Sequence, residues 1–328
     1  MRRWISRWRL TLALSLALVS WQGDDPAAAL RRPRDLIACA QPIHELSVLT
    51  YNVAGLPDAL SMSWPSRNCG LIGERLGGYS IACLQENFAW HAQLISRARL
   101  AYATTPDRVH NLAFGDGLCQ LGVFEQRAVR RTPWASCSGV MLDYSDCLAN
   151  KGILRVLHRI VVAPSRGEHD LEVLTVHMDA GDGPSDRAAR RRQFAQLERF
   201  VDTTTADRAV IVAGDFNATP SDDADRAQLD AFCAACSMHD VGRELGFDDH
   251  QIDRVLFRSG RRLELVPQEW RVATEFVDDH GEPLSDHPGI NVRFALRERE
   301  AAAPSTSRRV RPAATSAREL DVPADRGW

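Results

Sequence analysis

The sequence predicts an α/β fold class with one large domain, on the basis of three observations. Short apolar runs are separated by Gly, Pro and Asp, a pattern typical of buried or half-buried strands. Two longer segments have the spacing and start signals of helices. Once both chain ends are set aside, about 260 residues remain, which suits a single large α/β domain.

The expected elements follow the chain in order. Seven apolar runs are interpreted as strands: residues 46–53, 81–85, 118–124, 153–162, 172–177, 210–216 and 251–257. A helix is expected over residues 184–201, with Ser185 or Asp186 as its N-cap, and a second over residues 221–233. No internal repeat at solenoid periods is present.

The two chain ends differ in composition from the domain between them. Residues 1–29 combine a basic start, an apolar run over residues 10–21 and a small-residue triplet, which is the pattern of a secretory signal peptide. We therefore expect a secreted or periplasmic bacterial protein. Residues 297–328 have few large apolar side chains and are predicted to form a disordered tail. The folded domain is thus expected to cover residues 30–296.

Charge excludes one class of function. The chain has 40 basic and 43 acidic residues, a net charge of −3, and Lys151 is its only lysine. Residues 33–296 carry 27 basic and 36 acidic side chains, so this part is strongly acidic. Because Lys and Arg dominate binding to nucleic acid phosphates, a role in coating DNA is disfavoured. A metal-dependent enzyme remains compatible with this charge.

All eight cysteines follow the predicted signal peptide, and an even number in an exported protein suggests disulfides. Cys137 and Cys147 are close enough in sequence to close a local loop. Cys233 and Cys236, followed by His239, are interpreted as a disulfide or structural pair. Zinc is the less favoured reading, because a fourth ligand at zinc-site spacing is missing.

Polar side chains occur where the apolar runs begin or end. They are Asn52, Gln85, Glu86, His177, Asp215, Asn217, Asp253, Asp286 and His287. Any one of them could instead cap a turn or helix. In α/β folds, however, residues at one end of the strands converge on one crevice. The joint pattern therefore predicts a site for a hard cation and for acid–base chemistry.

These residues resemble the motifs of the endonuclease/exonuclease/phosphatase superfamily. The matching segments are Tyr51-Asn52-Val53, Gln85-Glu86, His177-Met178-Asp179, Gly214-Asp215-Phe216-Asn217, Ile252-Asp253 and Ser285-Asp286-His287. The resemblance spans about residues 44–296. It implies a DNase I-like four-layer α/β sandwich, in which two mixed β-sheets pack face to face with helices outside.

The resemblance also implies a divalent cation, with Mg²⁺ preferred and Mn²⁺ or another ion as an alternative. Glu86 would ligate the ion, and Asn52 would contact metal-bound water or phosphate. Asp286 would support the metal or the phosphate. Mg²⁺ usually takes one or two carboxylates plus waters and phosphate oxygens, which suits a site with one dominant glutamate.

Five further residues receive catalytic roles from the resemblance. His287 would deprotonate the attacking water, and Asp253 would orient its ring and raise its basicity. Asp215 and Asn217 would position that water and the developing phosphorane. His177 would donate to a phosphate oxygen or protonate the leaving oxygen. The implied reaction is in-line cleavage of a phosphoester, catalysed mainly by positioning and charge stabilisation.

A phospholipid head group is the favoured substrate, which implies a sphingomyelinase-like or phospholipase C-like phosphodiesterase. The expected export, the acidic domain and the apolar loop over residues 55–64 favour a lipid, and peripheral membrane contact is expected. Gly115-Asp116-Gly117-Leu118 and Asn150-Lys151-Gly152 are similar to sphingomyelinase-type members. Lys151 is therefore predicted near the substrate phosphate, and the protein is expected to be a monomer.

The alternative is a secreted endonuclease or exonuclease acting on DNA or RNA. Arginines at positions 187, 190, 191, 192, 254, 258, 261 and 262 could supply a basic groove for it. The run between residues 187 and 192 could equally be a solvated helix face. Two departures weaken lipid specificity: no clear aromatic-tipped hairpin is present, and residues 118–121 differ from the small polar run usual in the family.

Overall fold

The computed structural model describes residues 42–61, 63–107, 115–139, 146–162, 167–204, 208–247 and 251–299. The predicted signal peptide, Cys39 and residues 300–328 of the predicted tail lie outside the described residues. Within them, no helix has the length and apolar character needed to cross a membrane.

Two six-stranded mixed sheets form the centre of the fold. The first has the order β11-β12-β1-β2-β4-β3. Its strands are β1 (Glu45–Asn52), β2 (Ile81–Gln85), β3 (Tyr102–Ala103), β4 (Cys119–Gly122), β11 (Leu263–Ala273) and β12 (Gly289–Glu298). The second has the order β5-β6-β7-β8-β10-β9. Its strands are β5 (Gln126–Pro133), β6 (Gly152–Val161), β7 (Glu168–His177), β8 (Ala209–Asp215), β9 (His239–Asp240) and β10 (Asp253–Arg258).

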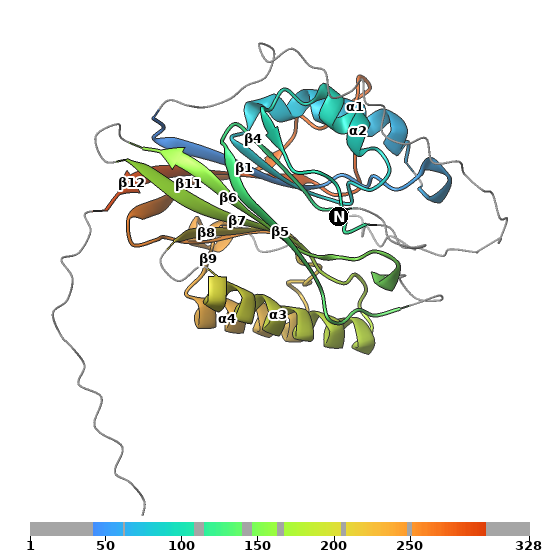
Figure 1. Ribbon diagram of the computed structural model, residues 1–328. Helices are drawn as coiled ribbons and strands as arrows, with labels where there is room; N and C mark the ends of the chain where they lie inside the picture. The colour runs from blue at the N-terminus through green and yellow to red at the C-terminus, as the bar shows by residue number, and fades with distance from the viewer. Residues whose placement is uncertain are drawn as a thin grey trace, which may run out of the picture.

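Helices cover the outer faces of the two sheets. The α-helices are α1 (Pro65–Arg75), α2 (His91–Arg97), α3 (Pro184–Thr204), α4 (Asp223–Cys236) and α5 (Val241–Glu244), and the 3₁₀ turns are η3 (Asp58–Leu60), η4 (Leu76–Gly78) and η5 (Asp146–Leu148). Figure 1 shows α1 and α2 on one side of the stacked sheets and α3 and α4 on the other. The predicted four-layer α/β sandwich is confirmed.

Apolar side chains from facing strands fill the space between the sheets. Val48 of β1, Val173 of β7 and Ile211 of β8 belong to one buried cluster with no exposed surface. Val210 and Val212 point to the opposite side of β8, where they join a second cluster with Phe194 of α3 and Phe232 of α4. Because successive strand residues face opposite sides, β8 contributes side chains to both buried clusters. Its residues must therefore be apolar on both faces.

Strand register brings the predicted site residues to one edge of the sandwich. β1 and β2 are parallel, and Asn52 lies beside Gln85 at their ends. β7 and β8 are also parallel, and His177 lies beside Asp215. β10 runs antiparallel to β8, so its first residue, Asp253, is also the partner of Asp215.

All seven predicted strands and both predicted helices are present, with shifted ends. The run at residues 284–287 was expected to close a strand, but it is a loop that leads into β12. The predicted boundary of the tail was also too early, since β12 pairs Arg297 with Glu264 and Leu263 with Glu298. A charged composition does not exclude a strand when its side chains alternate toward solvent.

The cysteine predictions had mixed outcomes. The loop closure between Cys137 and Cys147 is confirmed by a disulfide with a Cα–Cα distance of 5.4 Å. The expected disulfide between Cys233 and Cys236 is wrong, because both thiols are free. They lie three residues apart in α4. Such helix positions hold their Cβ atoms about 5–6 Å apart, whereas a disulfide needs about 3.5–4.5 Å.

Candidate active site

Strained backbone conformations mark the edge where the predicted residues meet. Four described residues other than glycine have positive φ angles, and three of them flank the site: Ala54 (47°), Glu86 (55°) and Asn217 (48°). Such conformations cost about 1–3 kcal/mol each and concentrate at functional sites. Each follows the end of a central strand closely, so the chain turns sharply where the strand ends bring the site residues together.

Asn52 connects the two sheets at this edge. Its Nδ2 donates to Glu86 Oε1 at 3.0 Å and to Asp215 Oδ2 at 3.2 Å. Its Oδ1 accepts from the backbone N–H of Ala54 at 3.1 Å. The Asn52 side chain is buried, and it holds a carboxylate from each sheet beside the other. Burial, followed by repulsion from Asp253, raises the pKa of Asp215 to about 7.

His287 and Asp253 form the predicted pair. The ring Nδ1 of His287 lies 2.8 Å from Asp253 Oδ2, and its Nε2 lies 3.9 Å from Asp215 Oδ2. Burial lowers the pKa of His287, but the carboxylates of Asp253 and Asp215 outweigh this effect and raise it well above its usual value. Because Asp253 engages Nδ1, the Nε2 atom is the one that lies toward Asp215.

His177 is buried, with 1% of its surface exposed. Its Nε2 is 3.5 Å from Asp215 Oδ2 and 4.0 Å from Glu86 Oε1. Burial, with the positive charges of Lys151 and His287 adding to it, lowers the pKa of His177 well below its usual value. The ring is therefore neutral near pH 7, and it can offer one N–H donor rather than a positive charge.

Lys151 and Asn217 meet at one backbone carbonyl. Lys151 Nζ donates to the carbonyl of Met178 at 3.3 Å, and Asn217 Nδ2 donates to the same oxygen at 3.0 Å. Asp146 Oδ1 pairs with Lys151 Nζ at 2.5 Å. Burial lowers the pKa of Lys151, yet Asp146 and the nearby Glu86 raise it more, so the ammonium stays charged. A buried positive charge thus lies near Glu86 and Asp215.

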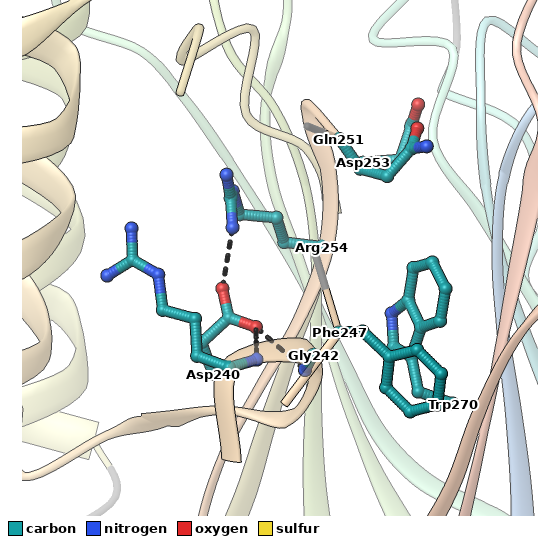
Figure 2. A pocket seen from close by; sticks show the side chains of 8 residues that line it. Asp240, Gly242, Phe247, Gln251, Asp253, Arg254 and Trp270 are labelled. Carbon is teal, nitrogen blue, oxygen red and sulfur yellow. Dashed lines mark hydrogen bonds and ion pairs between the residues drawn. The ribbon is translucent and has the colours of Figure 1, made fainter. Parts of the chain in front are cut away.

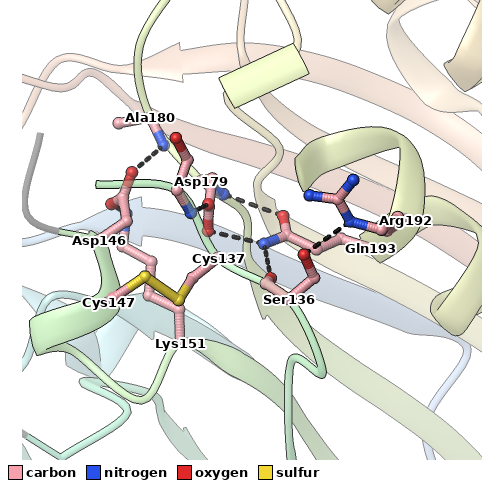
Figure 3. Close-up of a disulfide and its surroundings, with 10 residues drawn as sticks. Ser136, Cys137, Asp146, Cys147, Lys151, Asp179, Ala180, Arg192 and Gln193 are labelled. Carbon is pink, nitrogen blue, oxygen red and sulfur yellow. Dashed lines mark hydrogen bonds and ion pairs between the residues drawn. A yellow bond between two sulfur atoms is a disulfide. The ribbon is translucent and has the colours of Figure 1, made fainter. Parts of the chain in front are cut away.

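The disulfide segment holds this lysine and its partner in place. Figure 3 shows Asp146 next to the Cys137–Cys147 bond and above Lys151. The second carboxylate oxygen of Asp146 accepts from the N–H of Ala180 at 2.8 Å, in the segment that follows β7. The disulfide therefore closes a loop whose end anchors both Lys151 and the segment after His177.

The arginine run of α3 is only partly a solvated face. Arg190 is fully buried and forms two hydrogen bonds with Asp225, at 3.0 and 2.8 Å. It also donates to the carbonyl oxygens of Asp179 and Gly181. Arg190 therefore holds the segment after β7 in place. Because it is buried, it does not contribute to the predicted basic groove.

A second arginine of the predicted basic groove is also engaged elsewhere. Figure 2 shows a hollow beside Asp253, where Arg254 points toward Asp240 and Phe247 lies against Trp270. Arg254 is buried and pairs with Asp240 at 2.8 Å. Asp240 also caps α5 by accepting from the N–H of Gly242. Arg254 therefore supports the strand that carries Asp253. It does not contribute to the predicted basic groove.

The loop that carries His287 is fixed by α1. Asn68 Nδ2 donates to the carbonyl of Leu284 at 3.0 Å, and Arg75 donates to the carbonyl of Val277 at 2.7 Å. Ser285 Oγ donates to the carbonyl of Asn52 at 2.6 Å. Asn68 and Asp146 were not among the predicted site residues. Their sequence positions give no signal, since Asn68 acts through a backbone carbonyl far away along the chain, and Asp146 acts through Lys151 and the distant N–H of Ala180.

The donor set fits a hard divalent cation. Glu86 keeps 24% of its side chain exposed, and Asn52 donates to both Glu86 and Asp215. Oxygen donors of this kind suit Mg²⁺. Asp215, Asp253 and His287 also bring three candidate ligand atoms within 4.8 Å of one another. Asn52 uses its Nδ2 to hold the carboxylates. Asp286 is exposed and contacts Ser285. Metal binding by Asn52 and by Asp286 therefore stays a prediction.

The fold and this donor set define a class of protein: the phosphoric ester hydrolases of the α/β-sandwich type. Residues 49–287 match the model of the endonuclease/exonuclease/phosphatase family. The chain belongs to that family, as its motifs predicted.

Curated relatives narrow the comparison. A sphingomyelinase of Mycobacterium bovis is 32% identical over 271 residues, which cover 76% of this chain and 52% of the relative. A sphingomyelinase of Mycobacterium tuberculosis matches to the same extent. The chain spans about half the length of these relatives.

Solved structures share the fold at lower identity. Sphingomyelinase C from Streptomyces griseocarneus has a TM-score of 0.56 at 20% identity, covering 76% of this chain and 99% of that one. A Staphylococcus aureus beta toxin variant with bound magnesium ions has a TM-score of 0.57 at 16% identity, with 76% and 99% coverage. Humanised TDP2 of D. rerio has a TM-score of 0.60 at 18% identity, with 77% and 99% coverage.

Proposed function

We propose that this protein is an exported, metal-dependent phosphodiesterase that cleaves the head group of a phospholipid in the manner of a sphingomyelinase or phospholipase C. The observation that carries the substrate class is the 32% identity with curated sphingomyelinases over most of this chain. The disulfide between Cys137 and Cys147 supports an oxidising compartment outside the cytosol.

The chemistry is assigned to His287 first. In the neutral form of the ring, its Nε2 takes the proton of the attacking water, while Asp253 fixes the ring and balances the charge that forms. Asp215 lies on the far side of Nε2 and orients that water. The neutral His177 donates an N–H to a phosphate oxygen. Asn217 keeps the ends of β7 and β8 in register through Met178, which supports the placement of both groups.

Glu86 would hold a divalent cation, with Asn52 orienting its carboxylate and the exposed Asp286 supporting the metal or the phosphate. When bound, Mg²⁺ or a similar ion supplies positive charge that stabilises the phosphate oxygens in the transition state. Lys151, whose ammonium stays charged, supplies a second positive charge close to Glu86.

Lys151→Arg tests this role of the lysine. A guanidinium is larger and planar, so it cannot occupy a site built for a compact ammonium without displacing Asp146 or Met178. Turnover is expected to fall while Mg²⁺ dependence stays the same. Kinetics equal to the unmodified protein would remove Lys151 from the substrate site.

A substrate panel tests the proposed function. The full chain is assayed with Mg²⁺, and with EDTA as control, on sphingomyelin, phosphatidylcholine, duplex and single-stranded DNA, and inositol phosphates. Release of phosphocholine that EDTA abolishes is the expected result. Metal-dependent cleavage of DNA that falls steeply with salt, without lipid cleavage, would replace the lipid proposal by the nuclease alternative.

A further inference from the structure

Glu86 directs its side chain from a backbone conformation that residues other than glycine rarely adopt. Its φ angle is 55°, which lies in the left-handed region, and its Oε1 accepts from Asn52 Nδ2 at 3.0 Å. Such a conformation persists only where the surrounding structure over-determines it. The contacts that fix the backbone of Glu86 therefore also fix the direction of its carboxylate.

Gly55, in the segment after β1, supplies one of these contacts. Its N–H donates to the carbonyl oxygen of Glu86 at 2.9 Å, and its own carbonyl oxygen accepts from the N–H of Ala89 at 3.0 Å. A Cβ atom at position 55 would lie 2.6 Å from that oxygen of Glu86, well inside the contact distance of carbon and oxygen. Only glycine therefore lets the two segments lie this close together.

Gly117, in the turn before β4, supplies a second contact. Its carbonyl oxygen accepts from the N–H of Asn87 at 2.8 Å. Its φ angle is 67°, and a Cβ atom at this position would lie 2.5 Å from Cε1 of the Phe88 ring. Both the backbone conformation and the nearby ring therefore require glycine. Gly55 and Gly117 thus hold Glu86 and Asn87 through backbone atoms.

Asp116 and Arg131 connect the turn at Gly117 to the other sheet. Asp116 Oδ1 accepts from the N–H of Leu118 at 2.9 Å, and its carboxylate pairs with Arg131 of β5. Arg131 also donates to the carbonyl oxygen of Leu118 at 3.1 Å. The Asp116 side chain is 7% exposed, so water competes little for this pair. The turn that contacts Asn87 is therefore anchored in both sheets.

We propose that Gly55 and Gly117 are positioning residues, which set the direction of the Glu86 carboxylate for binding a divalent cation. This inference rests on the proposed function, because it takes Glu86 as the metal ligand. Groups that orient a metal ligand commonly contribute about 10–100-fold to metal affinity. The turn Gly115-Asp116-Gly117-Leu118 thereby acquires a physical role, since its second glycine admits a backbone contact that a side chain would block.

Direct titration of the full chain with Mg²⁺ alone, by isothermal titration calorimetry without substrate, tests this role. Gly55→Ala is compared with Gly78→Ala, and Gly117→Ala with Gly246→Ala. A Cβ atom at either control position would have no atom within 4 Å, and Gly246 shares the positive φ of Gly117, at 75°. The variants at Gly55 and Gly117 are expected to bind Mg²⁺ about tenfold more weakly, whereas both controls should bind like the unmodified protein.

Two further variants keep the test decisive. Phe88→Leu removes the ring atom that a Cβ atom at position 117 would meet. Combined with Gly117→Ala, it is expected to give tighter Mg²⁺ binding than Gly117→Ala alone. If neither glycine variant folds, as judged by circular dichroism, Asp116→Ala loosens the same turn without adding a side chain, and it should weaken Mg²⁺ binding several-fold.

The outcomes separate this inference from the proposed function. Folded glycine variants that bind Mg²⁺ like their controls, while Glu86→Gln binds it more weakly, would overturn the positioning role and leave Glu86 as the metal ligand. Equal binding by Gly117→Ala with and without Phe88→Leu would overturn the part assigned to Gly117. Mg²⁺ binding that Glu86→Gln leaves unchanged would overturn the proposed ligand, and the positioning role with it.

Discussion

The two sheets contribute to the candidate site in different ways. The sheet containing β7, β8 and β10 supplies His177, Asp215 and Asp253, each 1% exposed. The sheet containing β1 and β2, with the loop before β12, supplies Glu86 and His287, whose side chains are 24% and 19% exposed. One half of the site is therefore buried, and the other half faces solvent.

Burial explains what each half can do. The pKa of Asp215 is raised to about 7 and that of His177 is lowered well below its usual value, because charged forms are costly away from water. Partly exposed groups keep access to water and ions. We infer that the buried half orients the attacking water and a phosphate oxygen, while the exposed half supplies the base and holds the metal.

Replacing His287 should have the largest effect. His287→Ala removes the base from the exposed half and is expected to lower turnover by about 100-fold or more while the fold is kept. Phosphodiester hydrolysis at saturating Mg²⁺, with circular dichroism as a fold control, measures this. Near-normal turnover would refute the assignment of the base.

Glu86→Gln should separate metal binding from the fold. Loss of the carboxylate charge is expected to weaken the apparent Mg²⁺ affinity at least about tenfold, with smaller losses at saturating metal. A Mg²⁺ titration of activity gives the shift, and Glu282→Gln, on the exposed loop before β12, serves as control. An unchanged titration curve would place the metal elsewhere.

Asn68→Ala tests whether α1 positions the base from outside the site. It leaves the carbonyl of Leu284 without its buried donor, which costs about 1–3 kcal/mol. We expect kcat to fall several-fold with the Mg²⁺ affinity unchanged, because Glu86 is on a different segment. Leu229→Ala, a core variant in α4, controls for loss of stability alone. An equal fall of kcat in Leu229→Ala would show that Asn68 affects activity only through stability, and not by positioning the loop of His287.

The smallest effect concerns stability and pH. Burial lowers the pKa of His158 to about 3, against 6.5 in the unfolded chain, so only the unfolded state takes up the proton between these values. The contribution of this neutral histidine to the free energy of unfolding is fully present above pH 6.5. Below pH 6.5 that contribution falls by about 1.4 kcal/mol per pH unit. His158→Gln should reduce the loss between pH 7 and pH 5 by about 2 kcal/mol, as measured by urea unfolding. An equal loss in both proteins would contradict this.

Local patterns were sufficient for most of the fold. The apolar runs that became β1, β2, β7 and β8 are buried on both faces, so their hydrophobicity is continuous and easily read. β5, β11 and β12 carry charged residues that alternate toward solvent, and their strand character came only from pairing with neighbours. α1 was not predicted either, because two glycines within its eleven residues weaken the helix signal, although it holds the loop of His287.

The sequence alone determined the residue types of the site, because an amide, an imidazole or a carboxylate at the end of an apolar strand needs no partner to be recognised. It also determined the family, since several such endings in one order are specific. Only the tertiary structure decided that Asn52 donates to both carboxylates and that Arg190 and Arg254 are buried and hold neighbouring segments in place. Those properties arise from contacts between distant segments, and strand register across two sheets sets them.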